Sequence, residues 1–284
     1  AEYVARWGLP CNLIFGAAGM PAIAYAGALA QAERLGLLAS VRNWAGCSGG
    51  AIIAGLLAAG LPVARIAALA RTVDFARIMR VGRRAGRRFM RNHGMINGKR
   101  FVVTFRAALR AAVVDDKITL KALHDLRGGR AVFAVTCLTT SRVMYIDYRT
   151  HPDLPLWKAV RMAMSVPTVF APVEHGGDYY TDASVLAGLP VDAFHWDDIA
   201  PINQRTLSFW ATCDGVSDKP RDSIGAKLSA TADTMMAVGQ RFAMDEQDRQ
   251  RCIMIDCGRM SSMDFALSPA AREALIDAGA SAVV

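Results

Sequence analysis

The sequence predicts an α/β fold with a mostly parallel central sheet. An apolar run typical of a buried strand, followed by a glycine-containing turn and a helix, occurs twice within the first 60 residues. Strands that alternate with helices in this way build parallel sheets covered by helices. The chain has 284 residues, of which 53% are hydrophobic, enough for one well-buried domain. No repeat, linker or low-complexity tract divides it, so we expect a single domain over residues 1–284.

The first two strand–turn–helix units are the clearest elements. The apolar run 12–15 predicts a buried strand that ends at Gly16, and an Ala/Leu-rich helix is expected over 23–37. A second strand is expected over 41–45. It leads into a glycine-rich turn and a helix that ends near residue 59, before a Gly-Leu-Pro sequence.

The rest of the chain reads less regularly. Residues 71–100 form an Arg-rich segment with four glycines, and we expect broken helices on the surface or in a cap. Further helices are predicted over 104–114, 119–124 and 156–164. Further strands are predicted over 131–139, 143–148, 178–182, 207–212 and 253–256.

The glycine-rich turn after the second strand carries the first chemical signal. Gly46-Cys-Ser48-Gly-Gly50 fits the pattern G-x-S-x-G between a strand and a helix. A serine there projects from a strained elbow, and the helix start presents free N–H groups to a developing anion. The alternative is a turn whose serine only caps the helix. Because strand and helix both flank the motif, we favour Ser48 as a nucleophile and Gly46 and Gly50 as the glycines of the elbow.

A serine hydroxyl needs a base, and the sequence offers two. Asp182 ends an aromatic strand and is followed by small residues, so its carboxylate can face the elbow across the sheet; its alternative role is a turn or N-cap aspartate. The order Ser48, Asp182, His195 also matches the triads of α/β-hydrolases, but that fold builds several strands before its elbow. We expect His195 to be a surface imidazole. A Ser-His-Asp esterase stays open as an alternative.

Four segments, in the same order, resemble the patatin-like phospholipase family along nearly the whole chain. The sequence 46–50 resembles its nucleophile elbow, and 165–173 (SVPTVFAPV) resembles its Ile-Pro-x-x-Phe-x-Pro-Val segment. The stretch 180–191 resembles its Asp-Gly-Gly block with the trailing Pro-Val, and 23–29 resembles the helix after its oxyanion-hole glycines. Together these motifs are far more specific than any one of them.

The resemblance implies a three-layer α/β/α fold and hydrolysis of fatty acyl esters at lipid interfaces. It implies a Ser48/Asp182 dyad that works without histidine, through an acyl-enzyme and without a cofactor. The N–H groups near Ala18 and Gly19, with that of Gly49, would form the oxyanion hole. An apolar pocket would raise the pKa of Asp182 above about 3.9 and make it a usable base.

Cysteine spacing and glycine patterning exclude other cofactor classes. The six cysteines form no CxxC pair and have no Cys/His spacing, so we expect free thiols and no metal site. FGAAGMP follows a strand but lacks G-x-G-x-x-G, and no acidic residue ends the second strand, which argues against a dinucleotide.

The sequence departs from the family at the oxyanion loop. The family's Gly-Gly-Gly-x-Arg/Lys-Gly aligns with 17–22, where only Gly19 persists and Pro21 replaces the basic residue. Alanine resists the positive φ that such a turn often needs, and losing one oxyanion donor costs roughly 100- to 1,000-fold in turnover. The Asp-Gly-Gly block is likewise Asp182-Ala-Ser. A catalytically silent module that binds lipid or a partner is therefore a further alternative.

A basic charge balance indicates the class of partner. The net charge is +8 and the pI is about 9.4, which favours anionic partners. Arginines and apolar residues interleave in the Arg-rich segment, and this suits peripheral contact with an anionic membrane; a solvated basic surface is the alternative. The residues chosen for membrane contact are Arg83, Arg84, Arg87 and Arg88. No reading motif supports nucleic acid, and without a signal or spanning pattern we expect a cytoplasmic location.

Overall fold

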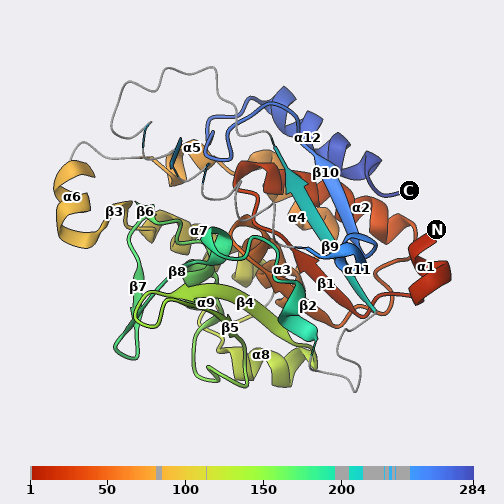
Figure 1. Ribbon diagram of the computed structural model, residues 1–284, viewed down its shortest axis with the longest axis horizontal. Coiled ribbons are helices and arrows are strands. Elements are labelled where there is room, and N and C mark those ends of the chain that lie inside the picture. Colours follow the sequence, from red (N-terminus) through yellow and green to blue (C-terminus); the bar gives the residue numbers. More distant parts are fainter. Residues whose placement is uncertain are drawn as a thin grey trace.

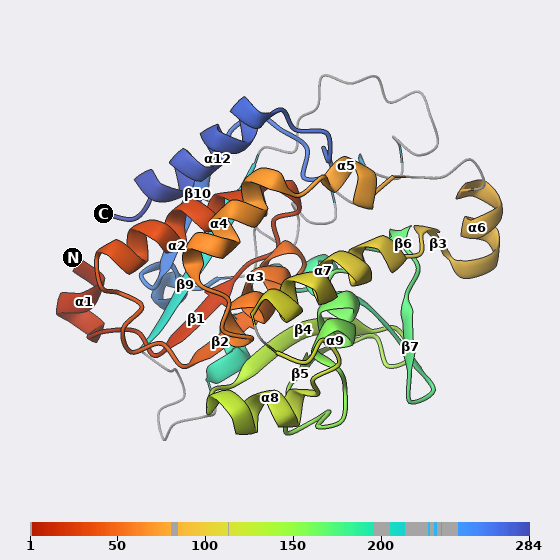
Figure 2. The ribbon, with the colours of Figure 1, turned by 180° about the vertical axis from the view of Figure 1, so that it is seen from behind.

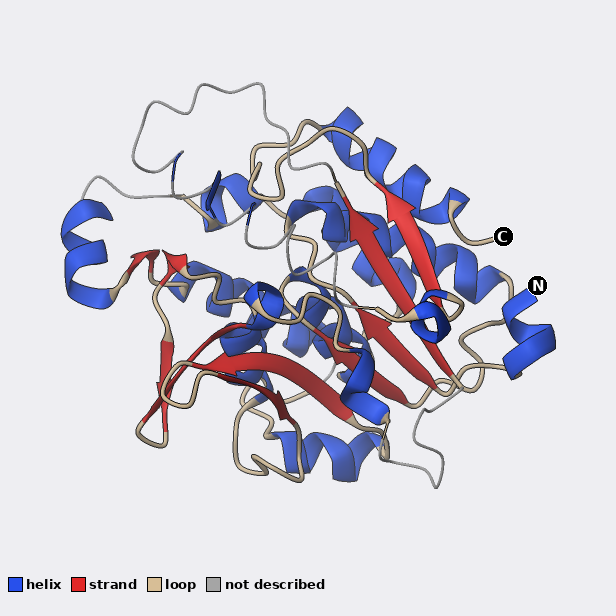
Figure 3. Cartoon of the chain, in the orientation of Figure 1, coloured by secondary structure: helices blue, strands red, loops and turns tan. Residues whose placement is uncertain are grey.

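An eight-stranded sheet forms the centre of the computed structural model, which describes residues 2–80, 85–112, 114–195, 205–213, 227, 230–231, 234 and 244–284. Its strands are β1 (Asn12–Phe15), β2 (Asn43–Gly46), β4 (Ala131–Cys137), β5 (Arg142–Ile146), β7 (Val173–His175), β8 (Asp178–Asp182), β9 (Thr206–Thr212) and β10 (Cys252–Asp256). The strand order is β10–β9–β1–β2–β4–β8–β7, and β5 also pairs with β4 (Figures 1 and 3). The first five strands of this order run parallel.

Helices surround this sheet and connect its strands. The α-helices are α1 (Glu2–Trp7), α2 (Ala24–Arg34), α3 (Gly49–Ala58), α4 (Val63–Thr72), α5 (Phe75–Ile78), α6 (Ala85–Asn92), α7 (Lys99–Ala111), α8 (Leu120–Arg127), α9 (Leu156–Ala163), α11 (Glu246–Arg249) and α12 (Pro269–Ser281). Short 3-10 helices are η1 (Met20–Ile23), η2 (Ala183–Val185) and η3 (Val191–Phe194). A separate two-stranded parallel sheet pairs β3 (Gly94–Ile96) with β6 (Thr168–Phe170).

Each face of the sheet buries its own core. Leu13 and Phe15 of β1 face a large core that α2, α3, α4, α7, α9 and α12 also fill, and Figure 2 has α2, α4 and α12 in front of the strands. Ile14, between them, faces a smaller core with Phe194 and Trp210, on the side that η3 covers. This alternation is what a strand buried on both faces requires. The predicted α/β fold with a mostly parallel sheet between helical layers is confirmed.

One edge of β4 brings two distant segments together. β5 pairs with β4 from Phe133 to Cys137, so β2 and β8 must both lie on the opposite edge. There β2 ends with Gly46 beside Phe133, and β8 begins its pairing two residues further along, with Asp182 beside Val135. The turn after β2 therefore lies close to Asp182, the last residue of β8.

Several predicted boundaries and omissions need correction. The helix predicted over 104–114 begins earlier, at Lys99, because Gly98 adopts a left-handed conformation and starts it there. The helix predicted over 23–37 is α2, which ends at Arg34 before Gly36. Helices α4 and α12, strand β7 and the small β3–β6 sheet were not predicted. Within the described part of the chain, no helix is both long and apolar enough to cross a bilayer.

Candidate active site

Ser48 occupies a strained turn between β2 and α3. Its φ of 55° and ψ of −126° lie in a region that non-glycine residues rarely adopt. Ser48 stands at the N-cap position of α3, yet its side chain makes no capping hydrogen bond. The helix-capping alternative therefore does not hold. The residue is 3% exposed, and its hydroxyl is not used to cap the helix.

Two glycines make this turn sterically feasible. A Cβ on Gly50 would collide with the carbonyl oxygen of Phe15 in β1, and a Cβ on Gly46 would collide with the carbonyl of Gly50. The backbone around Ser48 is thus folded tightly against the neighbouring strand. A non-glycine residue held at positive φ costs about 1–3 kcal/mol, so the surrounding contacts must hold Ser48 in place.

Asp182 ends β8 and is fully buried. Its Oδ1 accepts hydrogen bonds from the Ser184 N–H, at 2.8 Å, and from the Cys47 thiol, at 3.4 Å. Its Oδ2 makes no hydrogen bond of ordinary geometry among the described residues, although the Ser48 hydroxyl is close enough to stabilise the charged carboxylate. Asp182 therefore caps η2 with Oδ1, while Oδ2 keeps its hydrogen-bonding capacity.

The pKa of Asp182 is raised above its ordinary value. Burial is the largest cause, because desolvation penalises the charged carboxylate. The Ser184 N–H and the nearby Ser48, Ser184 and Cys47 side chains oppose this shift because they stabilise the charged form. A carboxylate with a raised pKa binds a proton more readily, as a base in an acyl transfer must.

The turn after α9 holds both Ser48 and Asp182 by their backbones. The Ser48 N–H donates to the Ala163 carbonyl and the Asp182 N–H donates to the Ser165 carbonyl, each at 3.0 Å. The Thr181 hydroxyl also donates to the Ser165 carbonyl. Since the two main acceptors are only two residues apart, a single short segment fixes the separation between the elbow and the end of β8.

Arg161 holds the turn after α9 in place through hydrogen bonds. It is 4% exposed, and its guanidinium donates to the Ser165 hydroxyl and, at 3.0 Å, to the Ala171 carbonyl. The guanidinium also lies 4.9 Å from the ring centre of Phe170. Among the described residues no carboxylate pairs with Arg161, and burial lowers its pKa to about 10. Sequence reasoning missed this residue because an arginine in an amphipathic helix usually faces solvent.

The loop from Gly16 to Gly19 presents N–H groups beside the elbow. The N–H groups of Ala18, Gly19 and Gly49 make no hydrogen bond to another described residue, whereas that of Ala17 donates to the Gly188 carbonyl at 2.7 Å. A Cβ built on Gly49 would lie 3.0 Å from the Gly19 carbonyl oxygen, so the loop and the start of α3 touch. Three unpaired donors near Ser48 suit a developing oxyanion.

The backbone conformation of this loop does not require positive φ at its alanines. Gly19 has a φ of 61°, whereas Ala17 and Ala18 do not have positive φ. The one position of the loop that needs glycine has therefore kept it. Pro21 lies within the first turn of η1, where its missing N–H is tolerated.

His195 lies at the opposite end of the sheet. Its Nδ1 is 2.8 Å from Asp192, and the carbonyl of Ala193, in the same short helix, accepts from Arg130 just before β4. Ser48 follows the carboxyl end of β2, which runs parallel to β4. Within the described residues, no histidine hydrogen bonds to Ser48 or Asp182. The Ser-His-Asp alternative is therefore wrong for this arrangement.

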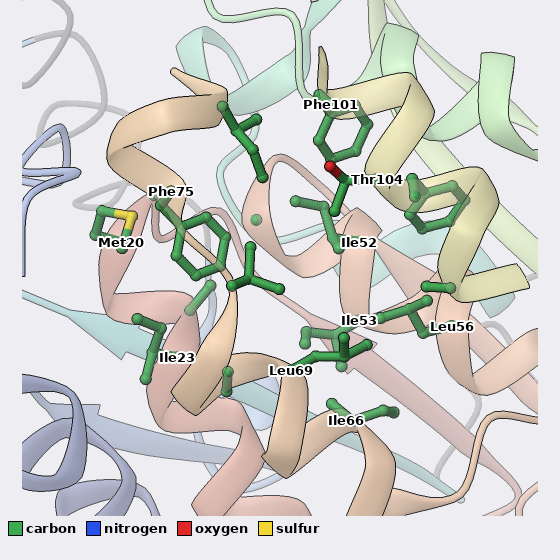
Figure 4. A pocket seen from close by; sticks show the side chains of 18 residues that line it. Met20, Ile23, Ile52, Ile53, Leu56, Ile66, Leu69, Phe75, Phe101 and Thr104 are labelled. Carbon is green, nitrogen blue, oxygen red and sulfur yellow. The ribbon is translucent and has the colours of Figure 1, made fainter. Parts of the chain in front are cut away.

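An apolar cavity of about 110 Å³ begins at the oxyanion loop. Gly19 and Gly49 line one part of it, and the other walls come from η1, α3, α4, α5 and α7 (Figure 4). Apart from glycines and alanines, its lining side chains are Met20, Ile23, Ile52, Ile53, Leu56, Ile66, Leu69, Val73, Phe75, Ile78, Phe101, Thr104 and Phe105. The Thr104 hydroxyl donates to the Arg100 carbonyl, so no lining side chain offers a free donor. The sequence analysis predicted no cavity at these positions.

The remaining predicted residues are placed only in part. Arg83 and Arg84 lie outside the described residues, Arg87 is exposed on α6, and Arg88 belongs to the same helix. The six cysteines form no disulfide with one another. Among the described residues, no three His, Cys, Asp or Glu side chains cluster as metal ligands would.

Comparison with known proteins gives a consistent family. A model of the patatin-like phospholipase family matches residues 13–195. The chain is 24% identical to the uncharacterized protein YqhO of Bacillus subtilis (strain 168) over 282 residues, which cover 94% of each protein. It is 19% identical to "Probable lipid hydrolase 463L" of Invertebrate iridescent virus 6 over 99 residues, which are 35% of this chain and 34% of the viral protein.

The structural comparison agrees on the fold. VipD from Legionella pneumophila superposes with a TM-score of 0.61 and 16% identity, over 97% of this chain and 66% of VipD. This chain thus spans slightly less than two thirds of VipD and matches about a third of the viral protein. Because the identity is so low, the likeness to VipD shows the fold alone.

We expect the Cys47 thiol to tune Asp182. Replacing Cys47 with Ala removes a donor to Oδ1, which destabilises the charged carboxylate, so the pKa of Asp182 should rise further above about 3.9. Cys47→Ser keeps a donor and should return the pKa toward the wild-type value. Carbon-13 NMR titration of the Asp182 carboxyl measures both shifts. An unchanged or lowered pKa in a folded Cys47→Ala protein would show that the thiol does not donate to this carboxylate.

Proposed function

This chain belongs to the patatin-like phospholipase family, and from that premise we propose that it hydrolyses acyl esters of lipids, with Ser48 as nucleophile and Asp182 as base. The observation that carries the proposal is a buried aspartate, with one oxygen free of hydrogen bonds among the described residues, close to a serine held at positive φ. A serine held at positive φ between a strand and a helix has the geometry of a nucleophile elbow. The three unpaired N–H groups nearby support acyl transfer rather than simple binding.

The reaction follows from these positions. The Ser48 hydroxyl oxygen attacks the ester carbonyl carbon while Asp182 takes its proton. The negative charge on the carbonyl oxygen is stabilised by the N–H groups of Ala18, Gly19 and Gly49. Collapse of the tetrahedral intermediate expels the alcohol, which receives the proton from Asp182. Water, deprotonated by Asp182, then attacks the acyl-Ser48 ester; the fatty acid is released, and Asp182 returns the proton to the Ser48 oxygen.

The apolar cavity is the natural place for the acyl chain. It begins at Gly19 and Gly49, beside the proposed position of the carbonyl carbon, and it is walled by aliphatic and aromatic side chains. An engineered apolar cavity of about 150 Å³ stays dry and binds benzene, so a cavity of this size and lining favours a hydrocarbon over water. The alcohol portion of the substrate would then lie outside the cavity.

We expect Ser48→Ala and Asp182→Asn each to remove nearly all hydrolysis of a soluble short-chain ester, because the two side chains act as one unit. Turnover should fall at least 1,000-fold, the order of loss seen when a member of such a unit is removed. A fluorophosphonate probe should label Ser48 in the wild type. Circular dichroism and thermal unfolding control for folding.

Two results would contradict this proposal. If a folded Asp182→Asn protein kept more than about a tenth of the wild-type rate, the aspartate would not be a general base. If Ser48 in the folded wild type failed to react with the probe, the chain would be a silent member of its family.

Filling the cavity should change acyl-chain preference. Ala70 of α4 lines the cavity, and Ala70→Phe adds a ring to it. We expect kcat/KM for a long-chain ester to fall about 100-fold, since overpacking costs about 1–3 kcal/mol, while an acetyl ester is spared. The control is Ala64→Phe, on the exposed face of the same helix. Equal losses on both esters would mean that the chain binds elsewhere.

We also propose that α6 contacts anionic membranes. This helix lies at one end of the molecule, far from both termini (Figures 1 and 2), and it exposes Arg87, Arg91 and, at 79%, Met90. Basic residues beside an apolar side chain on a projecting helix suit the interfacial region of a bilayer.

Replacing Arg87 and Arg91 with Gln should weaken co-sedimentation with anionic liposomes about tenfold or more, because each Arg near such a surface contributes about 1 kcal/mol. The loss should shrink as salt is raised. Arg34→Gln/Arg65→Gln, which removes two exposed charges from α2 and α4, is the control. Equal weakening by both pairs would reflect net charge rather than a contact through α6.

A further inference from the structure

A second, charged cleft lies between α5 and α7. It encloses about 430 Å³ and is lined by three cationic side chains, Arg77, Lys99 and Arg100, against one carboxylate, Asp74. The Asp74 side chain already accepts a hydrogen bond from the Arg77 N–H at 2.9 Å. The Arg100 guanidinium donates to the Arg77 carbonyl at 3.1 Å, which ties α7 to α5 across the cleft. The cleft therefore has an excess of positive charge.

This cleft adjoins the apolar cavity. Val73, Ile78 and Thr104 line both, so these three side chains form the boundary between a hydrocarbon-like interior and a cationic exterior. Val103, 68% exposed, adds an apolar contact on the outer side. A cavity and a cleft joined in this way are complementary to an amphiphile with an anionic group.

The charged cleft lies at the catalytic end of the cavity. Helix α7 begins after Gly98, where an added Cβ would meet the guanidinium of Arg161, the residue that anchors the turn holding Ser48 and Asp182. The opposite end of the cavity is formed by Leu56 and Ile66, and Figure 4 shows both on the far side from Phe101 and Thr104. An acyl chain that points toward Leu56 thus leaves its ester, and whatever the ester is attached to, near the cationic cleft.

We propose that the α5–α7 cleft binds the phosphate of an amphiphilic ester substrate, with Lys99 and Arg100 as its principal ligands and Arg77 beside them. This rests on the proposed hydrolysis at Ser48 and gives that reaction a preference for phospholipids over neutral glycerides. A phosphate oxygen accepts strong hydrogen bonds from lysine and arginine, whereas a glyceride offers no charge to these side chains.

The test uses two soluble substrates that differ in the phosphate. Dihexanoyl phosphatidylglycerol, below its micelle concentration, is compared with dihexanoylglycerol, so that membrane contact plays no part. For Lys99→Gln/Arg100→Gln we expect kcat/KM on the phospholipid to fall about tenfold or more, the effect of at least one lost charge-assisted contact. Hydrolysis of dihexanoylglycerol should not change. The control Arg34→Gln/Arg65→Gln should leave both substrates unaffected.

Two kinetic results would overturn the cleft assignment. Equal losses on both substrates would make Lys99 and Arg100 structural supports of α7. No loss on the phospholipid would mean that its phosphate lies elsewhere.

A binding measurement separates this proposal from the proposed hydrolysis. Calorimetry with Ser48→Ala protein compares the diether analogue of the phospholipid, which cannot be hydrolysed, with the matching diether glycerol. Tighter binding of the phosphate-bearing diether, lost on adding Lys99→Gln/Arg100→Gln, supports the cleft even if the wild type hydrolyses neither ester. Equal binding of the two diethers contradicts it. If inorganic phosphate alone bound as tightly and with the same dependence on Lys99, the cleft would be a free-phosphate site and the lipid assignment would fail.

Discussion

Two backbone hydrogen bonds from a single turn determine the geometry of the site. The carbonyls of Ala163 and Ser165 accept from the N–H groups of Ser48 and Asp182, which lie 134 positions apart in the sequence. Ser48 would otherwise relax from its positive φ, at a gain of about 1–3 kcal/mol, and its hydroxyl would turn away from the carboxylate. The proposed reaction needs atoms placed within a fraction of an ångström, so it depends on this turn more than on any side chain in it.

Arg161 explains how so short a turn stays rigid. Burying a guanidinium without a carboxylate costs several kcal/mol, and the cost is offset here by hydrogen bonds to Ser165 and Ala171 and by the ring of Phe170. These partners belong to the segment that runs from the end of α9 through β6 to Ala171. The Arg161 guanidinium therefore links the two ends of that segment through hydrogen bonds. A methionine of similar shape would fill the space without making these bonds.

The sequence predicted the features that depend on local chemistry and missed those that depend on register. The elbow could be predicted because only glycine fits at positions 46 and 50. Strand β8 could be predicted because aromatic residues precede Asp182. The pairing of β2 with the first part of β4 and of β8 with its last part could not be predicted, because no local pattern specifies which strand pairs with which. Helix α12 escaped prediction because its alanines and glycine give it only a weak apolar stripe. The cavity was missed for a related reason: its lining looks like core until the helices are placed.

Two of the alanines that replace family glycines, Ala17 and Ala183, lie in one contact set. Ala17 and Ala183 pack with Cys47 and Ala134 in a small buried cluster. Neither alanine has positive φ, so each methyl group was gained without backbone strain. Where the native φ suits it, alanine in place of glycine stabilises a protein by about 0.4–1 kcal/mol, because the unfolded chain loses freedom. The same methyl groups confine the thiol that donates to Oδ1 of Asp182. The departures from the family pattern therefore tighten the surroundings of the carboxylate, and the one glycine that the oxyanion loop requires is retained at Gly19.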